Sequence, residues 1–362
     1  NKMKNVMKYM LVALTAISFS VANAGELAIT GDAKASYVIT GSDGAKGGME
    51  KNKSLGVSNE FSLSASGELD NGWSWNYAQD IDGATVQDDG KLTVTMGGTG
   101  TLGIFISEGG IESINAASQS VISRPSDTSL DENMLDNFNL SGFNTIQYHT
   151  PADLLPFGIT AKVAYAPSTT AAANSYKAGG AATSSSFTAA TNSGASADPF
   201  AQTAAMGRSA THYRVDASPI DGLKIGADYV DFDKVNSTEQ SPESGAYYAT
   251  YAVGPATIGY SRGYLATALG VATDVLESVD SRKYSIAANV NDNFSISYED
   301  EESDPTLQTS STTTYPVQSR GIQAAYTMGG MTLAVAMNDH ENIEYTDGKD
   351  ANETVLSVAM AF

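Results

Sequence analysis

Hydrophobic and polar residues alternate along much of the chain with a period of two. Between Leu55 and Leu69 the odd positions are mostly apolar, whereas the even positions are glycine, serine or glutamate. This period indicates a β-strand with one apolar and one polar face. The strand is longer than the five or six residues that are usual in soluble proteins, and its length suits a tilted strand that crosses a membrane.

The same alternating unit recurs along the rest of the chain. We predict strands at residues 26–40, 54–69, 72–82, 90–97, 100–107, 142–150, 157–166, 208–218, 222–232, 245–254, 256–265, 281–291, 293–303, 318–328, 331–341 and 353–362. Tight turns such as Asp70-Asn71-Gly72 alternate with long polar links, as expected of an antiparallel barrel with its short turns at one end. A soluble β-sandwich would instead have polar outer faces. We therefore predict an all-β fold, a transmembrane antiparallel β-barrel of sixteen strands that forms one domain over residues 25–362.

The segment before Gly25 has the features of a secretory signal peptide. Two residues precede Met3; Lys4 and Lys8 follow it, then an apolar stretch from Met10 to Val21, and the segment ends Ala22-Asn23-Ala24. The apolar stretch is shorter than the roughly 20 residues that a transmembrane helix needs. We expect residues 1–24 to be removed on export, which leaves a free secreted protein or an outer-membrane barrel as the destination.

Charge and residue usage exclude several classes of function. The chain has 20 Lys and Arg against 41 Asp and Glu, a net charge of −21, and no run of basic residues, which argues against nucleic acid as a partner. It has no cysteine, so disulfides and thiol chemistry are excluded. A lipid-facing esterase would need a serine beside a histidine on the outer wall. The alternation of inward and outward positions along the strands places His149 and His212 inside the barrel, and His340 lies at a loop edge, so no Ser/His pair is indicated. Without a phosphate-binding glycine loop or a zinc helix, we expect no enzyme activity.

Two segments carry a resemblance to a known family. The chain ends in an alternating strand, Val355 to Phe362, that finishes on an aromatic residue, and residues 143–167 read FNTIQYHTPADLLPFGITAKVAYAP. In these two segments and in its signal peptide the chain resembles the Gram-negative general porins of the alphaproteobacterial type, although the Ala/Ser/Thr-rich segment 168–209 departs from that family. The resemblance implies a sixteen-stranded barrel in the outer membrane of a Gram-negative bacterium. It also implies a homotrimer, a third loop that folds inward to narrow the pore, and a terminal Phe362 that the barrel-assembly machinery recognises.

The candidate third loop, Ser107 to Ser141, is rich in carboxylates. Its charged residues, which we predict to form the pore constriction, are Glu108, Glu112, Arg124, Asp127, Asp131, Glu132 and Asp136. Strand parity predicts a basic lumen wall of Lys34, Lys162, Arg214, Lys224 and Lys283. Carboxylates that face cations across a narrow passage would sort solutes by charge and dipole. The alternative is that these acids only solvate an extracellular loop, but apolar residues such as Ile114 and Phe138 in the loop favour packing against a wall.

The function that we predict is passive diffusion of small hydrophilic solutes and ions through a water-filled channel, with outer-membrane lipid as the other partner and no cofactor. The alternative is a non-conducting structural or adhesive surface barrel. The net negative charge predicts mild cation selectivity.

Acid-dense segments at residues 299–304 and 339–353 could hold Ca²⁺ or Mg²⁺ and bridge to anionic lipid headgroups, or could simply be solvated. Segment 168–209 has too few apolar residues to fold alone, and we predict a surface loop.

Overall fold

The computed structural model describes residues 27–42, 52–57, 60–82, 89–106, 108–127, 134–138, 140–141, 143–167, 188–190, 202–205, 209–232, 240, 243–266, 276–307 and 313–361. The predicted signal peptide and Phe362 lie outside these residues. Strands dominate the described chain, and its helical elements are short 3-10 turns. Within the described residues there is no helix long and apolar enough to cross a membrane.

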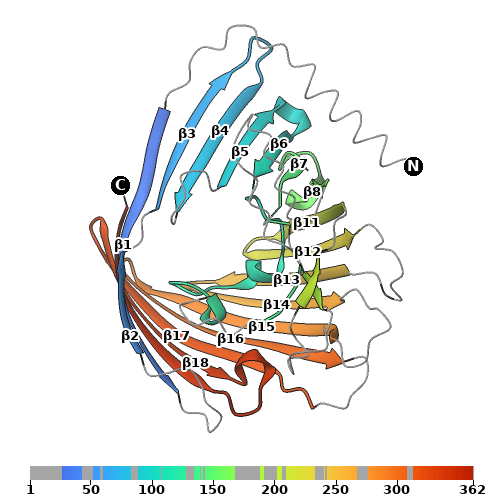
Figure 1. Ribbon diagram of the computed structural model, residues 1–362. Coiled ribbons are helices and arrows are strands. Elements are labelled where there is room, and N and C mark those ends of the chain that lie inside the picture. Colours follow the sequence, from blue (N-terminus) through green and yellow to red (C-terminus); the bar gives the residue numbers. More distant parts are fainter. Residues whose placement is uncertain are drawn as a thin grey trace.

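The strands follow one another around a ring (Figure 1). They are β1 (Leu27–Ser42), β2 (Asn52–Val57), β3 (Glu60–Glu68), β4 (Ser74–Asp82), β5 (Asp89–Thr95), β6 (Thr101–Ile106), β7 (Thr145–His149), β8 (Thr160–Ala166), β11 (Ala210–Ile220), β12 (Leu223–Phe232), β13 (Glu243–Val253), β14 (Ala256–Ala266), β15 (Leu276–Asn291), β16 (Phe294–Leu307), β17 (Val317–Met328), β18 (Met331–Glu341) and β19 (Ala351–Ala361). These bounds lie within a few residues of the predicted strands, the largest difference being the longer start of β15.

Antiparallel pairing closes the ring. Each strand pairs with the next one along the wall, and β19 pairs with β1, for example Val355 opposite Val38. Both β2 and β3 pair with β1 in one continuous register, in which Ala35 faces Val57 and Leu27 faces Ala65. They are therefore two parts of one strand, and the wall is a closed antiparallel barrel of sixteen strands.

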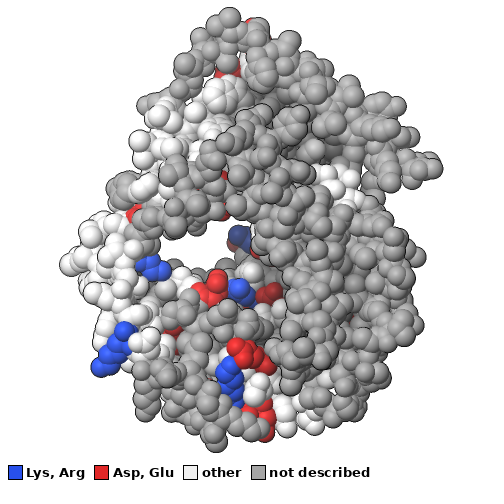
Figure 2. Space-filling view, viewed as in Figure 1, with Lys and Arg blue, Asp and Glu red and all other residues white. Residues whose placement is uncertain are grey.

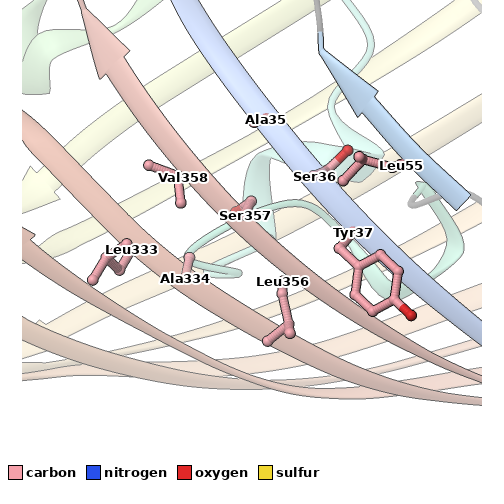
Figure 3. Close-up of a pocket in the computed structure, with 9 residues that line it drawn as sticks. All are labelled: Ala35, Ser36, Tyr37, Leu55, Leu333, Ala334, Leu356, Ser357 and Val358. Carbon is pink, nitrogen blue, oxygen red and sulfur yellow. The ribbon is translucent and has the colours of Figure 1, made fainter.

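The two faces of the wall differ as the alternation predicts. In β15 the side chains of Lys283 and Ser285 are buried inside the barrel, whereas Tyr284 and Ile286 are exposed on the outside. Figure 3 shows the outer face where β1, β2, β18 and β19 meet, with Tyr37, Leu55, Leu333, Leu356 and Val358 around a shallow groove of about 330 Å³. Apolar side chains therefore cover the outside, and polar ones line the inside.

The long polar segment between β8 and β11 contains a pair of strands that the sequence did not predict. Strands β9 (Thr188–Ala190) and β10 (Gln202–Ala205) form a two-stranded antiparallel sheet of their own, separate from the barrel sheet. Residues 168–187, 191–201 and 206–208 of this segment lie outside the described residues.

Candidate functional site

The third loop, which links β6 to β7, runs inside the barrel along the wall. Near its start the guanidinium of Arg214 in β11 donates to the backbone carbonyl of Glu112 at 2.6 Å. The backbone N–H of Ser113 then donates to Asp228 of β12 at 2.7 Å, and the Ser113 hydroxyl donates to the same carboxylate oxygen. Two adjacent strands thus hold the first turn of the loop.

Further on, the loop crosses four more strands. Ser261 of β14 donates to the carbonyl of Ile114 at 2.7 Å, and Ser285 of β15 donates to the carbonyl of Ala117 at 2.5 Å. The hydroxyls of Ser118 and Ser120 both donate to Glu299 of β16, and the N–H of Ile122 donates to Gln323 of β17. In Figure 1 the 3-10 turns η2 (Ile114–Ala117) and η3 (Pro125–Asp127) accordingly lie inside the ring, beside β13–β17.

Glycines in the wall allow the loop to lie this close. A Cβ atom added at Gly259 of β14 would stand 2.0 Å from the carbonyl oxygen of Ala117. One added at Gly263 would meet the carbonyl oxygen of Asp136 at 3.0 Å, and one at Gly321 of β17 would meet the ring of Pro125 at 2.8 Å. Glycine is the residue that permits such close backbone approach.

The return part of the loop packs into an apolar cluster. Phe138 meets Phe232 of β12 edge-on, with ring centroids 5.4 Å apart, and Leu140 and Phe143 join the same cluster with Leu265 of β14. The expectation that the loop's apolar residues pack against a wall is met here, since Phe138 and Leu140 are buried.

A buried cluster of charges joins the two arms of the loop to the wall. Lys283 of β15 is 1% exposed, and its Nζ lies 2.8 Å from Asp136 on the return arm and 3.0 Å from Glu301 of β16. Arg124 on the outgoing arm lies 3.2 Å from Glu301 and 3.4 Å from Asp136. The hydroxyl of Ser126 also donates to Glu301. Two cations and two carboxylates thus neutralise one another between the loop and the wall.

This cluster shifts the pKa values of the loop groups. Burial alone would raise the pKa of the Asp136 carboxyl, but Lys283 and Arg124 outweigh burial, so the pKa lies below its ordinary value. Burial likewise disfavours charge on Arg124, but Glu301 and Asp136 outweigh it and the pKa of the guanidinium is raised. Both side chains therefore remain charged near neutral pH.

We expect Asp136→Asn to lower the stability of the barrel at neutral pH by about 1.5–3 kcal/mol, because hydrogen bonds to a charged partner are lost. The folded-state pKa of Asp136 is depressed, so its contribution is present above the ordinary pKa of about 4 and is lost as the pH falls through the folded-state value. Urea unfolding in lipid vesicles at a series of pH values measures the difference between wild type and variant. The difference should be constant down to about pH 5 and vanish well below about pH 4; a decline between neutrality and pH 5 would contradict it.

The other predicted residues of the third loop are spread along it. Glu108 forms an ion pair with Lys91 of β5 at 2.5 Å, and one carboxylate oxygen of Glu112 is buried without a hydrogen-bond partner among the described residues. Asp127 is exposed and lies 4.0 Å from Arg124. The remaining two predicted residues, Asp131 and Glu132, lie outside the described residues.

The predicted basic wall residues all have the inward parity but differ in their surroundings. Lys283 lies beneath the loop, and Arg214 is held by Asp216 at 2.8 Å and lies over the ring of Tyr248. Lys162 of β8 faces Arg214 directly across the strand pair, and no carboxylate within the described chain lies within ion-pair distance of it. Lys224 is exposed near the turn into β12, and Lys34 of β1 is half-buried opposite Ala359.

Sequence analysis missed the wall residues that hold the loop. Glu299 and Glu301 belong to a segment that was interpreted as an acid-dense rim, but both point inward from β16 and accept hydrogen bonds from the loop. Asp228 and Gln323 were not singled out either. The alternation along β16 could have identified the two glutamates, because Glu299 and Glu301 occupy odd positions and point to the same side of the strand as the buried Ser297 and Ser303.

A buried serine–histidine contact is also present, contrary to the expectation that none would form. His340 is the penultimate residue of β18, next to the loop as expected, and its Nδ1 is 2.9 Å from the hydroxyl of Ser319 in β17. Both residues are fully buried, so this pair offers no site for a substrate. In the part of the chain that the structure describes, no three Asp, Glu or His side chains converge as metal ligands.

The lumen is open and carries both signs of charge. Figure 2 shows an opening through the molecule, with basic and acidic side chains on its lower border. The central charges under the loop are paired with one another.

Comparisons with known proteins give a likeness of fold. No protein-family model matches the sequence, and no curated protein matches it. The structure is similar to that of an anion-selective porin from Comamonas acidovorans, with a TM-score of 0.59 at 11% identity over 93% of this chain and 100% of that chain. Salmonella typhi OmpF, in a complex with daunomycin, gives a TM-score of 0.59 at 10% identity over 93% and 98% of the two chains. A variant of the Rh. blastica porin gives 0.54 at 11% identity over 93% and 100%.

These likenesses confirm the predicted fold class, a closed antiparallel barrel of sixteen strands. The resemblance to Gram-negative general porins is confirmed at the level of the fold.

Proposed function

We propose that the chain forms a water-filled channel in the outer membrane through which small hydrophilic solutes and ions diffuse passively. The observation that supports this most strongly is the third loop, which lies against one side of the inner wall by hydrogen bonds to β11–β17. A loop held to the wall narrows the lumen without filling it. No chemical reaction and no cofactor is part of this function.

Single-channel recording in a planar bilayer with neutral sugars of graded size tests the proposal. We expect discrete conductance steps that smaller sugars reduce and that sugars larger than the constriction leave unchanged. A silent bilayer with protein that is shown to be folded would favour the alternative, a structural or adhesive barrel with an occluded lumen.

We infer that the channel is mildly cation-selective. The carboxylates of Asp32 and Asp80 have the inward parity, and no lysine or arginine within the described residues lies within ion-pair distance of either. An excess of fixed negative charge favours cations in a narrow aqueous passage. Carboxylates of the third loop and basic wall residues such as Lys162 act on solutes as a transverse field across the remaining lumen.

Replacing Lys162 by glutamine is expected to strengthen the cation preference, because it removes a lumen cation without a carboxylate partner. Reversal potentials in a tenfold salt gradient measure this preference. A perfectly selective pore would give a reversal potential of about 59 mV, and we expect the variant to differ from the wild type by several millivolts. Lys53→Gln is the matched control, since Lys53 lies on the outer face of β2 opposite Ile39. Anion preference in the wild type would contradict the assignment.

Export and assembly complete the proposal. Residues 1–24 act as a signal peptide, and residues 25–362 insert as a single barrel domain. Pairing of β19 with β1 supports a role for the adjoining Phe362 as the signal for the barrel-assembly machinery. The resemblance to general porins supports a homotrimer in contact with outer-membrane lipid.

A further inference from the structure

Two arginines lie side by side on the outer face of the barrel. Arg262 of β14 and Arg282 of β15 are direct partners across the strand pair. Their neighbours Ser261 and Lys283 are buried inside the barrel, so both arginines point outward. Their side chains are 54% and 53% exposed.

Tyrosines mark the level of this pair. Tyr260 and Tyr284 lie two residues from the arginines on the same outer face, with ring centroids 5.1 Å apart. Tyr264 lies two residues beyond Arg262 in the other direction and is also exposed. Towards the short turns the same face becomes apolar, for example at Ile286. Tyrosines gather where a barrel passes from the hydrocarbon to the headgroups, so the arginines lie at headgroup level on the side of the long loops.

The chemistry of the pair suits an anion. Like charges directly opposite each other in a sheet are destabilising, so an anion between them would be stabilising. Each guanidinium donates to one carboxylate through a single nitrogen, Arg262 to Asp280 at 3.0 Å and Arg282 to Glu302 at 2.7 Å. A guanidinium has five N–H donors in a planar fork that matches phosphate, so each arginine retains donors for a second partner.

We propose that Arg262 and Arg282 together bind the phosphate group of a lipid headgroup in the outer leaflet, directly and without a divalent cation. The proposal rests on the proposed membrane location of the barrel. A cation bridge is not needed, because the nearby carboxylates of Asp280 and Glu302 are already paired with the arginines.

Native mass spectrometry of the full chain, released from micelles that contain equal amounts of phosphatidylglycerol and a neutral galactolipid of the same acyl chains, tests the proposal. We expect the wild type to retain phosphatidylglycerol preferentially. The variant Arg262→Gln/Arg282→Gln should retain it at least about tenfold less, since the loss of even one charge-assisted hydrogen bond corresponds to roughly that factor and the variant removes both arginines. Arg320→Gln is the matched control, because Arg320 also lies on the outer face but is shared between Asp300 and Glu341.

Each other outcome overturns the proposal. Equal retention by wild type and double variant, or an equal loss in Arg320→Gln, would show that no specific site exists. Loss of retention on adding a chelator would assign binding to a divalent cation. Stabilisation of the wild type alone by inorganic phosphate, without lipid retention, would assign the site to soluble anions. Conductance recorded from the same preparations separates these results from a failure of the proposed channel function.

Discussion

Valine at position 259 is expected to displace the third loop into the lumen and to reduce the conductance. Even a single added Cβ stands 2.0 Å from the carbonyl oxygen of Ala117 and 2.5 Å from the hydroxyl of Ser285, so the loop must retreat by about 1.4 Å to reach an ordinary contact of 3.4 Å. The hydrogen bond from Ser285 to Ala117 is then lost. Overpacking of this kind costs about 1–3 kcal/mol of stability. Single-channel conductance and sugar exclusion measure the narrowing.

Gly56→Val is the matched control for this prediction. Gly56 also lies in a wall strand, opposite Ser36, but a Cβ added there meets nothing closer than the Ser36 hydroxyl at 3.8 Å. We expect the control to keep the wild-type conductance and size limit. Unchanged sugar exclusion in Gly259→Val, with the barrel folded, would show that the loop does not form the narrowest part of the pore.

Lys283→Met is expected to destabilise the barrel and to make the open channel unsteady. The side chain is nearly completely buried, and its removal leaves Asp136 and Glu301 with only Arg124 as a cation. Breaking a buried ion pair by removing one partner costs about 3–5 kcal/mol. Urea unfolding in vesicles measures the loss, and single-channel traces should show frequent transitions between conductance levels because the return arm of the loop is no longer fixed.

A double variant distinguishes loss of this charge balance from loss of packing. In Lys283→Met/Glu301→Gln one cation and one carboxylate are removed together, so Arg124 and Asp136 remain as a neutral pair. We expect the double variant to recover part of the lost stability and steadier current. Lys224→Met, at an exposed lumen lysine, should behave as the wild type. A Lys283→Met channel as stable and steady as the wild type would contradict the role of the cluster.

The barrel could be predicted from the sequence because its signal is local. Each strand shows the alternation of apolar and polar residues within its own sequence. Short turns such as Asp70-Asn71-Gly72 indicate that the next strand runs antiparallel to the one before it. The sixteen strands could therefore be predicted without knowledge of contacts between distant residues. The predicted strand 54–69 shows the limit of this approach, since the structure assigns it as β2 and β3, which only their shared register on β1 identifies as one strand.

The interior could be predicted only in part, because its contacts join residues that are far apart in the sequence. Parity identified Lys283 as inward, but nothing local indicates that it lies under the loop beside Asp136, almost 150 residues earlier. The same holds for Gly259, whose importance lies in the backbone of Ala117. The expectation of an acidic loop facing a basic wall was therefore too simple, since Glu299 and Glu301 put acids in the wall and Arg124 puts a cation in the loop.

Most of the wall residues that hold the third loop come after the loop in the sequence. Its first contacts on β11 begin at Arg214, and the last, on β17 and in the turn after β18, are made by Gln323 and Tyr345, all of which follow the loop in the sequence. While the polypeptide is being delivered from its amino end, the loop already has Lys91 of β5 as a partner for Glu108, but its later polar contacts with the wall require strands that follow it. The loop can therefore be fixed along its full length only after the carboxy-terminal strands of the wall have been added.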